Sequence, residues 1–361
     1  MADAAVALQM TTEVELASLP SNEFNANAKS FNLQYFIWAF VLPVVLLVGI
    51  LGNILSIIVL RSKTFRFTTT GVYLPITAAA DTLFLLTGAL EILEMAEIFD
   101  VREYNVWTCR VYKVLHYTGG DVSIWLLVAF TFDRFVAVCF PLSKRRVCTW
   151  KRAVIASITI VLLSLAKNLH EFWTRGPEYR ANGQLRRICG SQEQYSFFLN
   201  FVRPWLVFVV VMAVPFILIL VFNCLIVYGL TAKRVRRLSL GTIPACTVSS
   251  GSVPTMGSGF RQTTFMCLSI SFAFLICIAP SIVLLIGKPY WKYRTNMAYK
   301  NAKAISNFLV FINHCINFFL YCVTGQRFRD ELKAMWTGKR RRVSMTPMTG
   351  TPRSSLGLIE I

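Results

Sequence analysis

The sequence predicts an all-α membrane protein: a bundle of seven transmembrane helices followed by a short amphipathic eighth helix. Seven stretches of the chain are long and apolar, 55% of its 361 residues are hydrophobic, and only 15% are charged. A helical span needs about 20 mostly apolar residues to cross a bilayer. Lipid leaves no partner for an exposed backbone N–H group, and the chain lacks the short alternating strands of a barrel, so the spans are expected to be helices.

The first four spans are predicted at residues 35–60, 71–99, 109–139 and 153–168. The run 41–51 is apolar on every face, which favours a helix in lipid over a helix of a soluble protein. Polar residues also lie within or at the edge of these spans, namely Asp81, Asp121 and the pair Asp133–Arg134. A charge in mid-membrane costs roughly 2.5–3.5 kcal/mol on insertion scales, so each of these residues needs a function or a partner. The fourth span is the weakest, because Lys167 interrupts it.

The last three spans are predicted at 205–230, 263–287 and 298–323. A short basic, aromatic loop joins the sixth and seventh spans, which favours adjacent antiparallel helices in one bundle. We therefore expect four parts in the chain. They are an extracellular disordered tail (1–34), a seven-transmembrane domain (35–323), a basic amphipathic eighth helix (324–337) and a cytoplasmic disordered tail (338–361).

Lysine and arginine residues assign the two sides of the membrane. The loops after the first, third and fifth spans and the tail after Val323 are strongly basic, whereas the other loops mix acidic and basic residues. The positive-inside rule places the basic side in the cytoplasm and the N-terminus outside. We expect a multi-pass protein of the plasma membrane, with membrane lipid as its surroundings. The net charge of +19 follows from this asymmetry and does not indicate a nucleic-acid partner.

Ten cysteines and three histidines limit the chemistry of the chain. Only Cys109 and Cys189 fall in the oxidising outer space, so we expect them to form a disulfide; two unpaired thiols are the alternative. No cysteine spacing suggests a zinc site. The histidines lack the spacing of an intramembrane metal site, and no nucleophile–base pair is visible in a span. Neither an enzyme nor an organic cofactor is therefore expected.

The end of the third span reads Thr131-Phe132-Asp133-Arg134-Phe135. An adjacent carboxylate and guanidinium at the membrane edge can hold each other until a partner arrives. A simple charge pair at the end of a helix is the alternative. The motifs in the other spans favour the first explanation.

These further motifs occur in a fixed order along the chain. They are Gly52-Asn53 in the first span, Asp81 in the second, Ser123 in the third, Pro215 in the fifth, Phe274 and Cys277–Pro280 in the sixth, Asn313, Asn317 and Tyr321 in the seventh, and Phe328 in the eighth helix. With these motifs, residues 35–336 resemble the rhodopsin-like (class A) G-protein-coupled receptors. The segment Asn317–Tyr321 lacks the usual proline, which is similar to invertebrate neuropeptide receptors of the FMRFamide-receptor type.

The chain departs from the usual pattern of this family at several positions. Phe135 follows Asp-Arg where tyrosine is usual, and Ile278 stands where the sixth span usually has tryptophan. Asn223 lies low in the fifth span where many members carry tyrosine. The resemblance therefore implies a variant of the activation mechanism, in which Phe274 rather than an indole is the packing switch.

The resemblance implies a receptor that couples ligand binding to a heterotrimeric G protein. Arg134 and the basic segment 144–146 would face the G protein. At three positions of the family pattern, side-chain oxygen atoms would bind a sodium ion, which offsets the charge of a buried carboxylate. His314 lies beside these positions and would modify the site. The sodium positions are Asp81, Ser123 and Asn313, and the coupling or switch positions are Asp133, Arg134, Phe274, Pro280, Asn317 and Tyr321.

Two ligand classes are disfavoured. An opsin needs a lysine in the middle of the seventh span, and an amine receptor needs an aspartate where this chain has His116. The outer rim is charged instead, and its three glutamates at spacing three share one helix face. This rim predicts a short peptide with an arginine or a lysine, and the family resemblance implies that its carboxy terminus is amidated; an acidic face exposed to solvent is the alternative. The candidate ligand-binding residues are Glu91, Glu94, Glu97, Lys113, His116 and Tyr117.

Two other functions stay open on the sequence alone. The first is a receptor of the same fold for a small amine or a lipid. The second is a membrane transporter, although the chain shows no internal repeat and no pair of interrupted spans.

The cytoplasmic segments carry candidate phosphorylation sites. Paired arginines precede Ser239 and Ser344, and Thr346 and Thr351 precede prolines. Receptor kinases would add about −1.5 to −2 charge at each site and could create a surface for arrestin. Disorder without regulation is the alternative.

Overall fold

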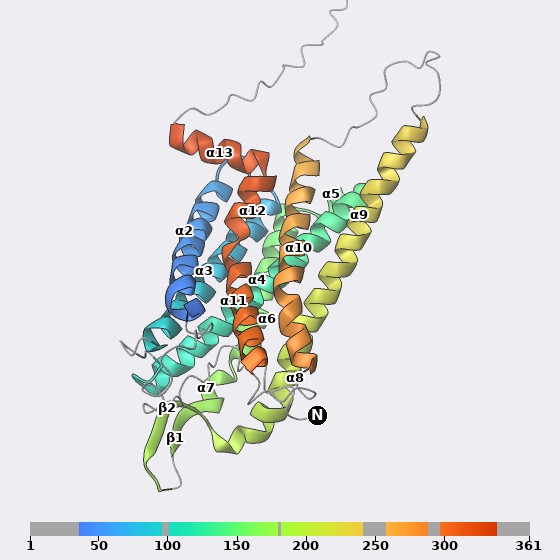
Figure 1. The fold of residues 1–361 in the computed structure, drawn as a ribbon. Helices are drawn as coiled ribbons and strands as arrows, with labels where there is room; N and C mark the ends of the chain where they lie inside the picture. Colours follow the sequence, from blue (N-terminus) through green and yellow to red (C-terminus); the bar gives the residue numbers. More distant parts are fainter. Residues whose placement is uncertain are drawn as a thin grey trace, which may run out of the picture.

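The computed structural model describes residues 36–95, 100, 102–179, 182–240, 258–287 and 297–337, and every structural statement below concerns these residues. Its long helices run side by side in one bundle (Figure 1). A β-hairpin lies at one end of the bundle, and helix α13 (Gln326–Thr337) crosses the opposite end; we call these the hairpin end and the α13 end. The bundle consists of α2 (Leu42–Leu60, after the π-helical turn Ile37–Val41), α3 (Thr70–Met95), α4 (Val106–Cys139), α6 (Trp150–Asn168), a fifth span made of the π-helical turns Phe198–Val202 and Phe208–Ala213 with α8 (Arg203–Val207) and α9 (Val214–Leu240), α10 (Ser258–Gly287), and α11 (Met297–Cys315) with α12 (Asn317–Thr324).

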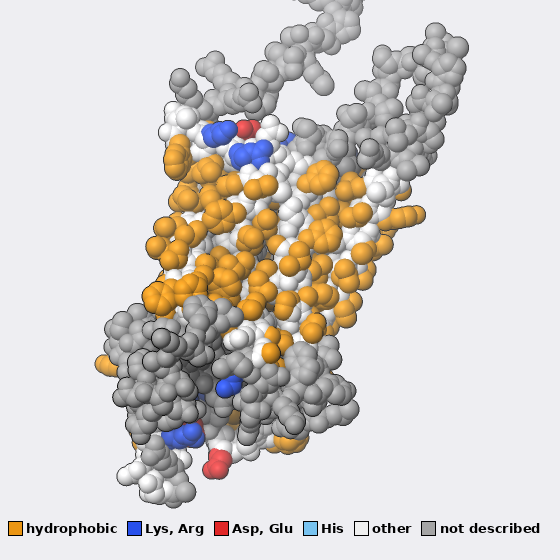
Figure 2. Space-filling view, viewed as in Figure 1, with side chains coloured by type: hydrophobic (Ala, Val, Ile, Leu, Met, Phe, Trp, Pro, Cys, Tyr) orange, Lys and Arg blue, Asp and Glu red, His pale blue; other side chains and the backbone are white. Residues whose placement is uncertain are grey.

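Six of the described helices are long and apolar enough to cross a membrane, and there are seven if α11 and α12 form one span. The axes of α11 and α12 differ in direction by 53°. Figure 2 shows hydrophobic side chains over the middle of the bundle and charged side chains toward its two ends. The described helices confirm the predicted all-α architecture of seven spans.

Helix α4 lies at the centre of the packing. It contacts α3, α6, α9 and α10, and buried residues occur along its whole length. A capping box fixes its first turn: the side chain of Asn105 accepts the N–H of Thr108 at 2.8 Å, and the Thr108 side chain accepts the N–H of Asn105 at 3.2 Å. The largest core cluster joins Phe130 of α4 to Phe274 of α10 and Tyr321 of α12. The helices that carry the predicted switch residues therefore share one core.

Two charged residues lie inside the spans that they were expected to interrupt. Helix α6 continues through Lys167 to the predicted end at Asn168, because this lysine pairs with Asp121 of α4 at 2.9 Å. The fifth span begins at residue 198 rather than at 205. Arg203 does not end that helix, because it is buried and pairs with Glu171. Both lysine and arginine stay inside their helices for one physical reason: a charge with a buried partner can stay inside an apolar helix.

The hairpin consists of β1 (Arg175–Tyr179) and β2 (Leu185–Ser191), which pair in antiparallel fashion. The short helix α7 (Glu171–Thr174) leads from α6 into β1. Cys189 of β2 forms a disulfide with Cys109 in the first turn of α4, which confirms the predicted pairing. The hairpin is thus bound covalently to the central helix of the bundle.

At the α13 end, α5 (Pro141–Val147) connects α4 to α6. Helix α13 follows α12 after Gly325 and turns across the bundle (Figure 1). The buried ring of Phe328 fixes this turn by packing against Tyr321, with ring centroids 5.5 Å apart. Residues 326–337 therefore form the predicted amphipathic eighth helix. The predicted tails, 1–34 and 338–361, lie outside the described residues.

Candidate functional site

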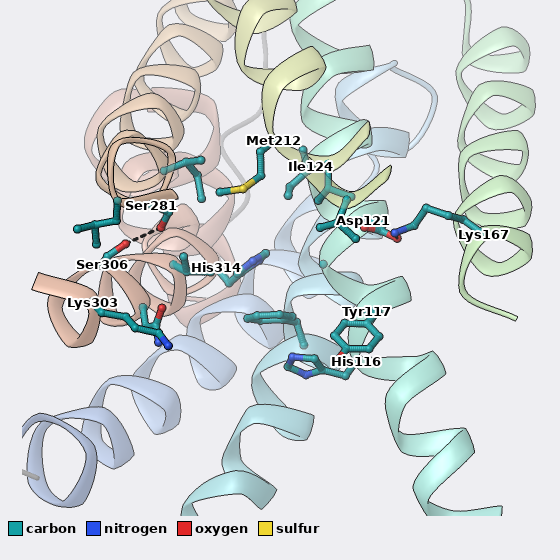
Figure 3. Close-up of a pocket in the computed structure, with 18 of the residues that line it drawn as sticks. His116, Tyr117, Asp121, Ile124, Lys167, Met212, Ser281, Lys303, Ser306 and His314 are labelled. Carbon is teal, nitrogen blue, oxygen red and sulfur yellow. Dashed lines mark hydrogen bonds and ion pairs between the residues drawn. The ribbon is translucent and has the colours of Figure 1, made fainter. Parts of the chain in front are cut away.

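A cavity opens among α3, α4, α6, α10, α11 and the fifth span, in the half of the bundle toward the hairpin end (Figure 3). Its walls are mostly apolar and include Phe84, Ile124 and Met212. Polar side chains enter it at a few points only. They are His116, Tyr117, Asp121, Lys167, Ser281, Tyr299, Lys303, Ser306, Asn307 and His314.

The one carboxylate among the cavity's described lining residues belongs to Asp121. Its Oδ2 atom lies 2.9 Å from Nζ of Lys167 and accepts a hydrogen bond from Nδ2 of Asn168 at 2.7 Å. Asp121 is 4% exposed, so this pair sits in surroundings of low dielectric constant, where its charges attract each other more strongly than in water. The negative charge of Asp121 is therefore already balanced within the protein.

Two of the predicted ligand-binding residues on α4 line the cavity, His116 and Tyr117. Nδ1 of His116 lies 2.7 Å from Oγ1 of Thr87, and its ring stacks on Phe84. Lys113 is buried beside them, and its ammonium lies 5.8 Å from the centre of the Tyr117 ring, but it is not among the lining residues. The cavity therefore unites two of the three predicted α4 positions.

The acidic rim cannot be placed around this cavity. Glu91 and Glu94 lie on α3, but their side chains are outside the description, and so are Glu97 and the loop 288–296. The proposed acidic face therefore stays a prediction.

A second polar cluster surrounds Asp81, which is fully buried. Its carboxylate oxygens accept hydrogen bonds from Oγ of Ser123 at 2.5 Å, Nδ1 of His314 at 2.6 Å and Nδ2 of Asn317 at 2.7 Å. Asn313 lines a small cavity together with Ser123 and Asn317. Sodium requires oxygen ligands, whereas these contacts of Asp81 are N–H and O–H donors. A sodium site at Asp81, Ser123 and Asn313 stays a prediction.

Asp133 and Arg134 form a closed arrangement near the α13 end. Arg134 pairs with Asp133, and its guanidinium also donates to Oγ1 of Thr69 at 2.9 Å. The same Thr69 hydroxyl donates to Asp133 at 3.0 Å. Nearby, burial and then the charge of Asp133 raise the pKa of the Cys148 thiol to about 12, so this thiol stays a neutral donor to the Asp133 carbonyl at 3.4 Å. Two residues adjacent in sequence are thus held by a third, which directly precedes α3.

The other predicted switch residues lie along the inner faces of α10 and α12. Phe274 and Tyr321 are fully buried in the main core, and Pro280 lies inside α10. Oγ1 of Thr131 on α4 is 3.1 Å from Oγ of Ser271 on α10 and links the two helices. Of the predicted phosphorylation sites, Ser239 lies on α9 with its side chain outside the description, and Ser344, Thr346 and Thr351 lie outside the described residues.

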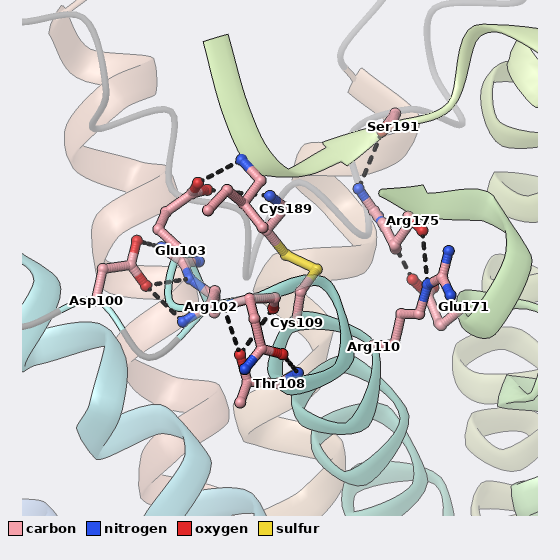
Figure 4. Close-up of a disulfide and its surroundings, with 12 residues drawn as sticks. Asp100, Arg102, Glu103, Thr108, Cys109, Arg110, Glu171, Arg175, Cys189 and Ser191 are labelled. Carbon is pink, nitrogen blue, oxygen red and sulfur yellow. Dashed lines mark hydrogen bonds and ion pairs between the residues drawn. A yellow bond between two sulfur atoms is a disulfide. The ribbon is translucent and has the colours of Figure 1, made fainter. Parts of the chain in front are cut away.

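The sequence did not identify the ion-pair cluster that anchors the hairpin (Figure 4). Glu171 is fully buried and pairs with Arg203 and, at 2.8 Å, with Arg175. Glu103 holds the other strand, because its carboxylate accepts the backbone N–H groups of Ile188 and Cys189. One signal could have revealed the first cluster: a lone arginine in the apolar run that starts the fifth span requires a buried partner.

The family model described as "7 transmembrane receptor (rhodopsin family)" matches residues 52–321. Similar proteins include the FMRFamide receptor of Drosophila melanogaster, which is 26% identical over 329 residues, or 85% of this chain. The chain spans 55% of the length of that receptor. The pyrokinin-1 receptor of Drosophila melanogaster is 23% identical, with 84% of this chain and 81% of that protein covered. The allatostatin-A receptor of Bombyx mori is 24% identical, with 78% and 74% covered.

Proposed function

Because the chain belongs to the rhodopsin family of seven-transmembrane receptors, we propose that it binds a short extracellular peptide and activates a heterotrimeric G protein. Membership of this family makes the chain a multi-pass membrane receptor rather than an enzyme. In our proposal it lies in the plasma membrane with its N-terminus and the hairpin end outside. The α13 end then meets the G protein in the cytoplasm.

The main observation in favour of a peptide ligand is that Asp121 is already paired with Lys167. A small amine needs a carboxylate partner when it leaves water, and the described cavity offers one carboxylate, which Lys167 already neutralises. The mostly apolar walls and the His116 and Tyr117 rings suit the side chains and amide groups of a peptide. The names of the FMRFamide, pyrokinin-1 and allatostatin-A receptors support the same ligand class.

We place the cation of the peptide at the rim rather than in the cavity. Glu91, Glu94 and Glu97 recur at spacing three, so a helix would present them on one face. An arginine can bind such carboxylates through two parallel hydrogen bonds. A carboxy-terminal amide would remove a negative charge that these acids repel. The apolar part of the peptide is then free to enter the cavity.

Charge reversal at the rim tests the cationic peptide. Glu91→Lys, Glu94→Lys and Glu97→Lys are each assayed with FMRFamide and with an analogue that carries glutamate in place of arginine. Loss of one partner of a partly buried ion pair costs about 2–5 kcal/mol. At least one variant should therefore lose about thirtyfold or more in FMRFamide potency and respond better to the analogue. Receptor activation is measured in cells as calcium and cAMP responses.

Glu193→Lys is the matched control, because Glu193 is exposed in a turn at the hairpin end and does not line the cavity. Unchanged potency in all three rim variants, at normal surface expression, would mean that the acids are a solvent-exposed face. Potent activation by a monoamine or a lipid instead would contradict the peptide itself.

We further propose that receptor kinases and arrestin regulate the protein through Ser239, Ser344, Thr346 and Thr351. Phosphate groups would add negative charge to a strongly basic tail. A receptor truncated after Gly338 should therefore internalise more slowly after agonist than the full chain, as measured by loss of surface label. Ser239→Ala in the full chain separates the contribution of the loop. Normal internalisation of the truncated receptor would show that the tail sites are not used.

A further inference from the structure

His314 belongs to two sites at once. Its imidazole is among the groups that line the cavity, and Figure 3 shows it pointing from α11 toward the centre of that space. Its Nδ1 atom lies 2.6 Å from Oδ1 of Asp81, in the interior of the bundle. One rigid ring therefore touches both the space that a ligand would fill and a buried carboxylate.

The Asp81 carboxylate determines which nitrogen of the ring faces which site. It already accepts hydrogen bonds from Ser123 and Asn317, and a carboxylate can only accept. His314 therefore donates to it from Nδ1. A neutral imidazole that carries its proton on Nδ1 has a lone pair on Nε2. Within the described part of the chain Nε2 of His314 has no hydrogen-bond partner, so this lone pair is available to a ligand in the cavity.

The ring cannot shift without changing its neighbours. It packs against Phe84 with ring centroids 4.2 Å apart, and Phe84 also stacks on His116 at 4.6 Å. The carbonyl group of His314 accepts a hydrogen bond from Nδ2 of Asn53 at 3.0 Å. This bond fixes the backbone at His314, next to the bend between α11 and α12. A push on the ring from the cavity therefore alters its bond to Asp81 or its contact with Phe84.

We propose that His314 is a positioning residue that couples the cavity to Asp81, with Nε2 accepting a hydrogen bond from an N–H or O–H donor of the ligand. This role depends on the proposed function, since it requires a ligand in the cavity. The path continues toward the α13 end, because Asp81 is bonded to Asn317, the first residue of α12 beyond the bend. Ile278 also lines the cavity, but its apolar side chain can form no such polar link.

Two amide substitutions separate the two ends of the imidazole. In His314→Asn the shorter side chain places an amide N–H near the position of Nδ1, so it keeps a donor for Asp81 and loses the group at Nε2. In His314→Gln the longer side chain reaches the position of Nε2 and loses the donor for Asp81. FMRFamide serves as the probe. Its affinity is measured by competition binding, and G-protein activation is measured with and without it.

We expect His314→Asn to lower FMRFamide affinity about tenfold, as the loss of one hydrogen bond would. Without ligand, the activation of His314→Asn should stay closer to the wild-type level than the activation of His314→Gln. His314→Gln should retain FMRFamide affinity and lose most of the response. In an Asp81→Asn background the Gln substitution should have no further effect on ligand-free activation, because residues that act through one contact are not additive. A purely structural role would add its effect to that of Asp81→Asn.

Wild-type activation and FMRFamide response in both His314 variants, at matched surface expression, would overturn the coupling. Additive effects of His314→Gln and Asp81→Asn would overturn it as well. If FMRFamide does not bind the wild-type receptor, this peptide is not a ligand of the receptor. The ligand-free comparison still decides the link to Asp81 in that case, because non-additivity supports the link and additivity rejects it.

Discussion

Replacing Arg134 with alanine should lower agonist-stimulated G-protein activation by about a hundredfold, with little change in ligand affinity. The Arg134 guanidinium is now held by Asp133 and by Thr69, at the end of the bundle that we assign to the cytoplasm. It lies far along α4 from the cavity residues His116 and Tyr117, so its removal should spare binding. In our proposal, movement of α10 away from α4 makes the same guanidinium available to the G protein. Activation is measured with purified G protein, and affinity is measured by competition binding.

Thr69→Val provides the matched comparison. It keeps the shape of the side chain but removes the hydroxyl that bridges Asp133 and Arg134. Both of these hydrogen bonds involve a charged group, and such a bond is worth about 1.5–3 kcal/mol, so ligand-free activation should rise about tenfold or more. Two neighbouring substitutions are thus expected to act in opposite directions. Full signalling by Arg134→Ala, at normal surface expression, would show that this arginine does not couple the receptor to its G protein.

The spans were predictable because the property that defines them is local. A bilayer selects for the length and apolarity of a continuous segment, and both can be read without knowledge of any partner. The start of the fifth span was less predictable for the same reason. Lys167 and Arg203 look like interruptions until Asp121 and Glu171, which are distant in sequence, are known to pair with them.

The bend in the seventh span shows another limit of motif reading. The usual proline is replaced by Phe318, yet α11 and α12 differ in direction by 53°. A helix also bends where a side chain inserts into its ladder of hydrogen bonds. Here Asn53 of α2 donates to the carbonyl of His314 next to the bend. A contact between the first and seventh spans thus accompanies a bend that no local residue pattern predicts.

The candidate site was predictable position by position but not as a set of contacts. Asp81, Ser123 and Asn317 were each named from motifs, and the structure brings them together. The bond from His314 to Asp81 depends on the relative rotation of α3 and α11, which a sequence pattern does not determine. Tertiary geometry therefore decides which partner Asp81 has, and so how this site can work.

Glu171→Gln should destabilise the receptor by about 3–5 kcal/mol, the cost of breaking a buried ion pair while its partner charges stay buried. Glu171 is fully buried, and its carboxylate balances two guanidinium groups, those of Arg175 and Arg203. The glutamine keeps the shape and removes the charge, so both cations lose their counter-ion. The effect is measured as the unfolding midpoint of the purified receptor.

The consequence should reach the hairpin and the cavity, because each arginine holds a further element. Arg175 opens β1 and donates to Ser191 at the end of β2 at 3.0 Å. Arg203 places its guanidinium 5.1 Å from the centre of the Tyr117 ring, which lines the cavity. Loss of the charge of Glu171 should therefore weaken ligand binding together with stability, although Glu171 does not itself line the cavity.

Glu178→Gln is the matched control, since it makes the same chemical change a few residues further along the chain, on β1 of the hairpin. Glu178 pairs with Arg186 at 2.8 Å, but the two side chains are 31% and 55% exposed. An exposed pair is worth about 0–1 kcal/mol, so this variant should unfold close to the wild-type midpoint. Glu171→Gln should unfold at least about 5 °C lower. Equal midpoints for the two variants would mean that the buried carboxylate does not anchor the hairpin, and that the disulfide between Cys109 and Cys189 and the contacts of Glu103 hold it instead.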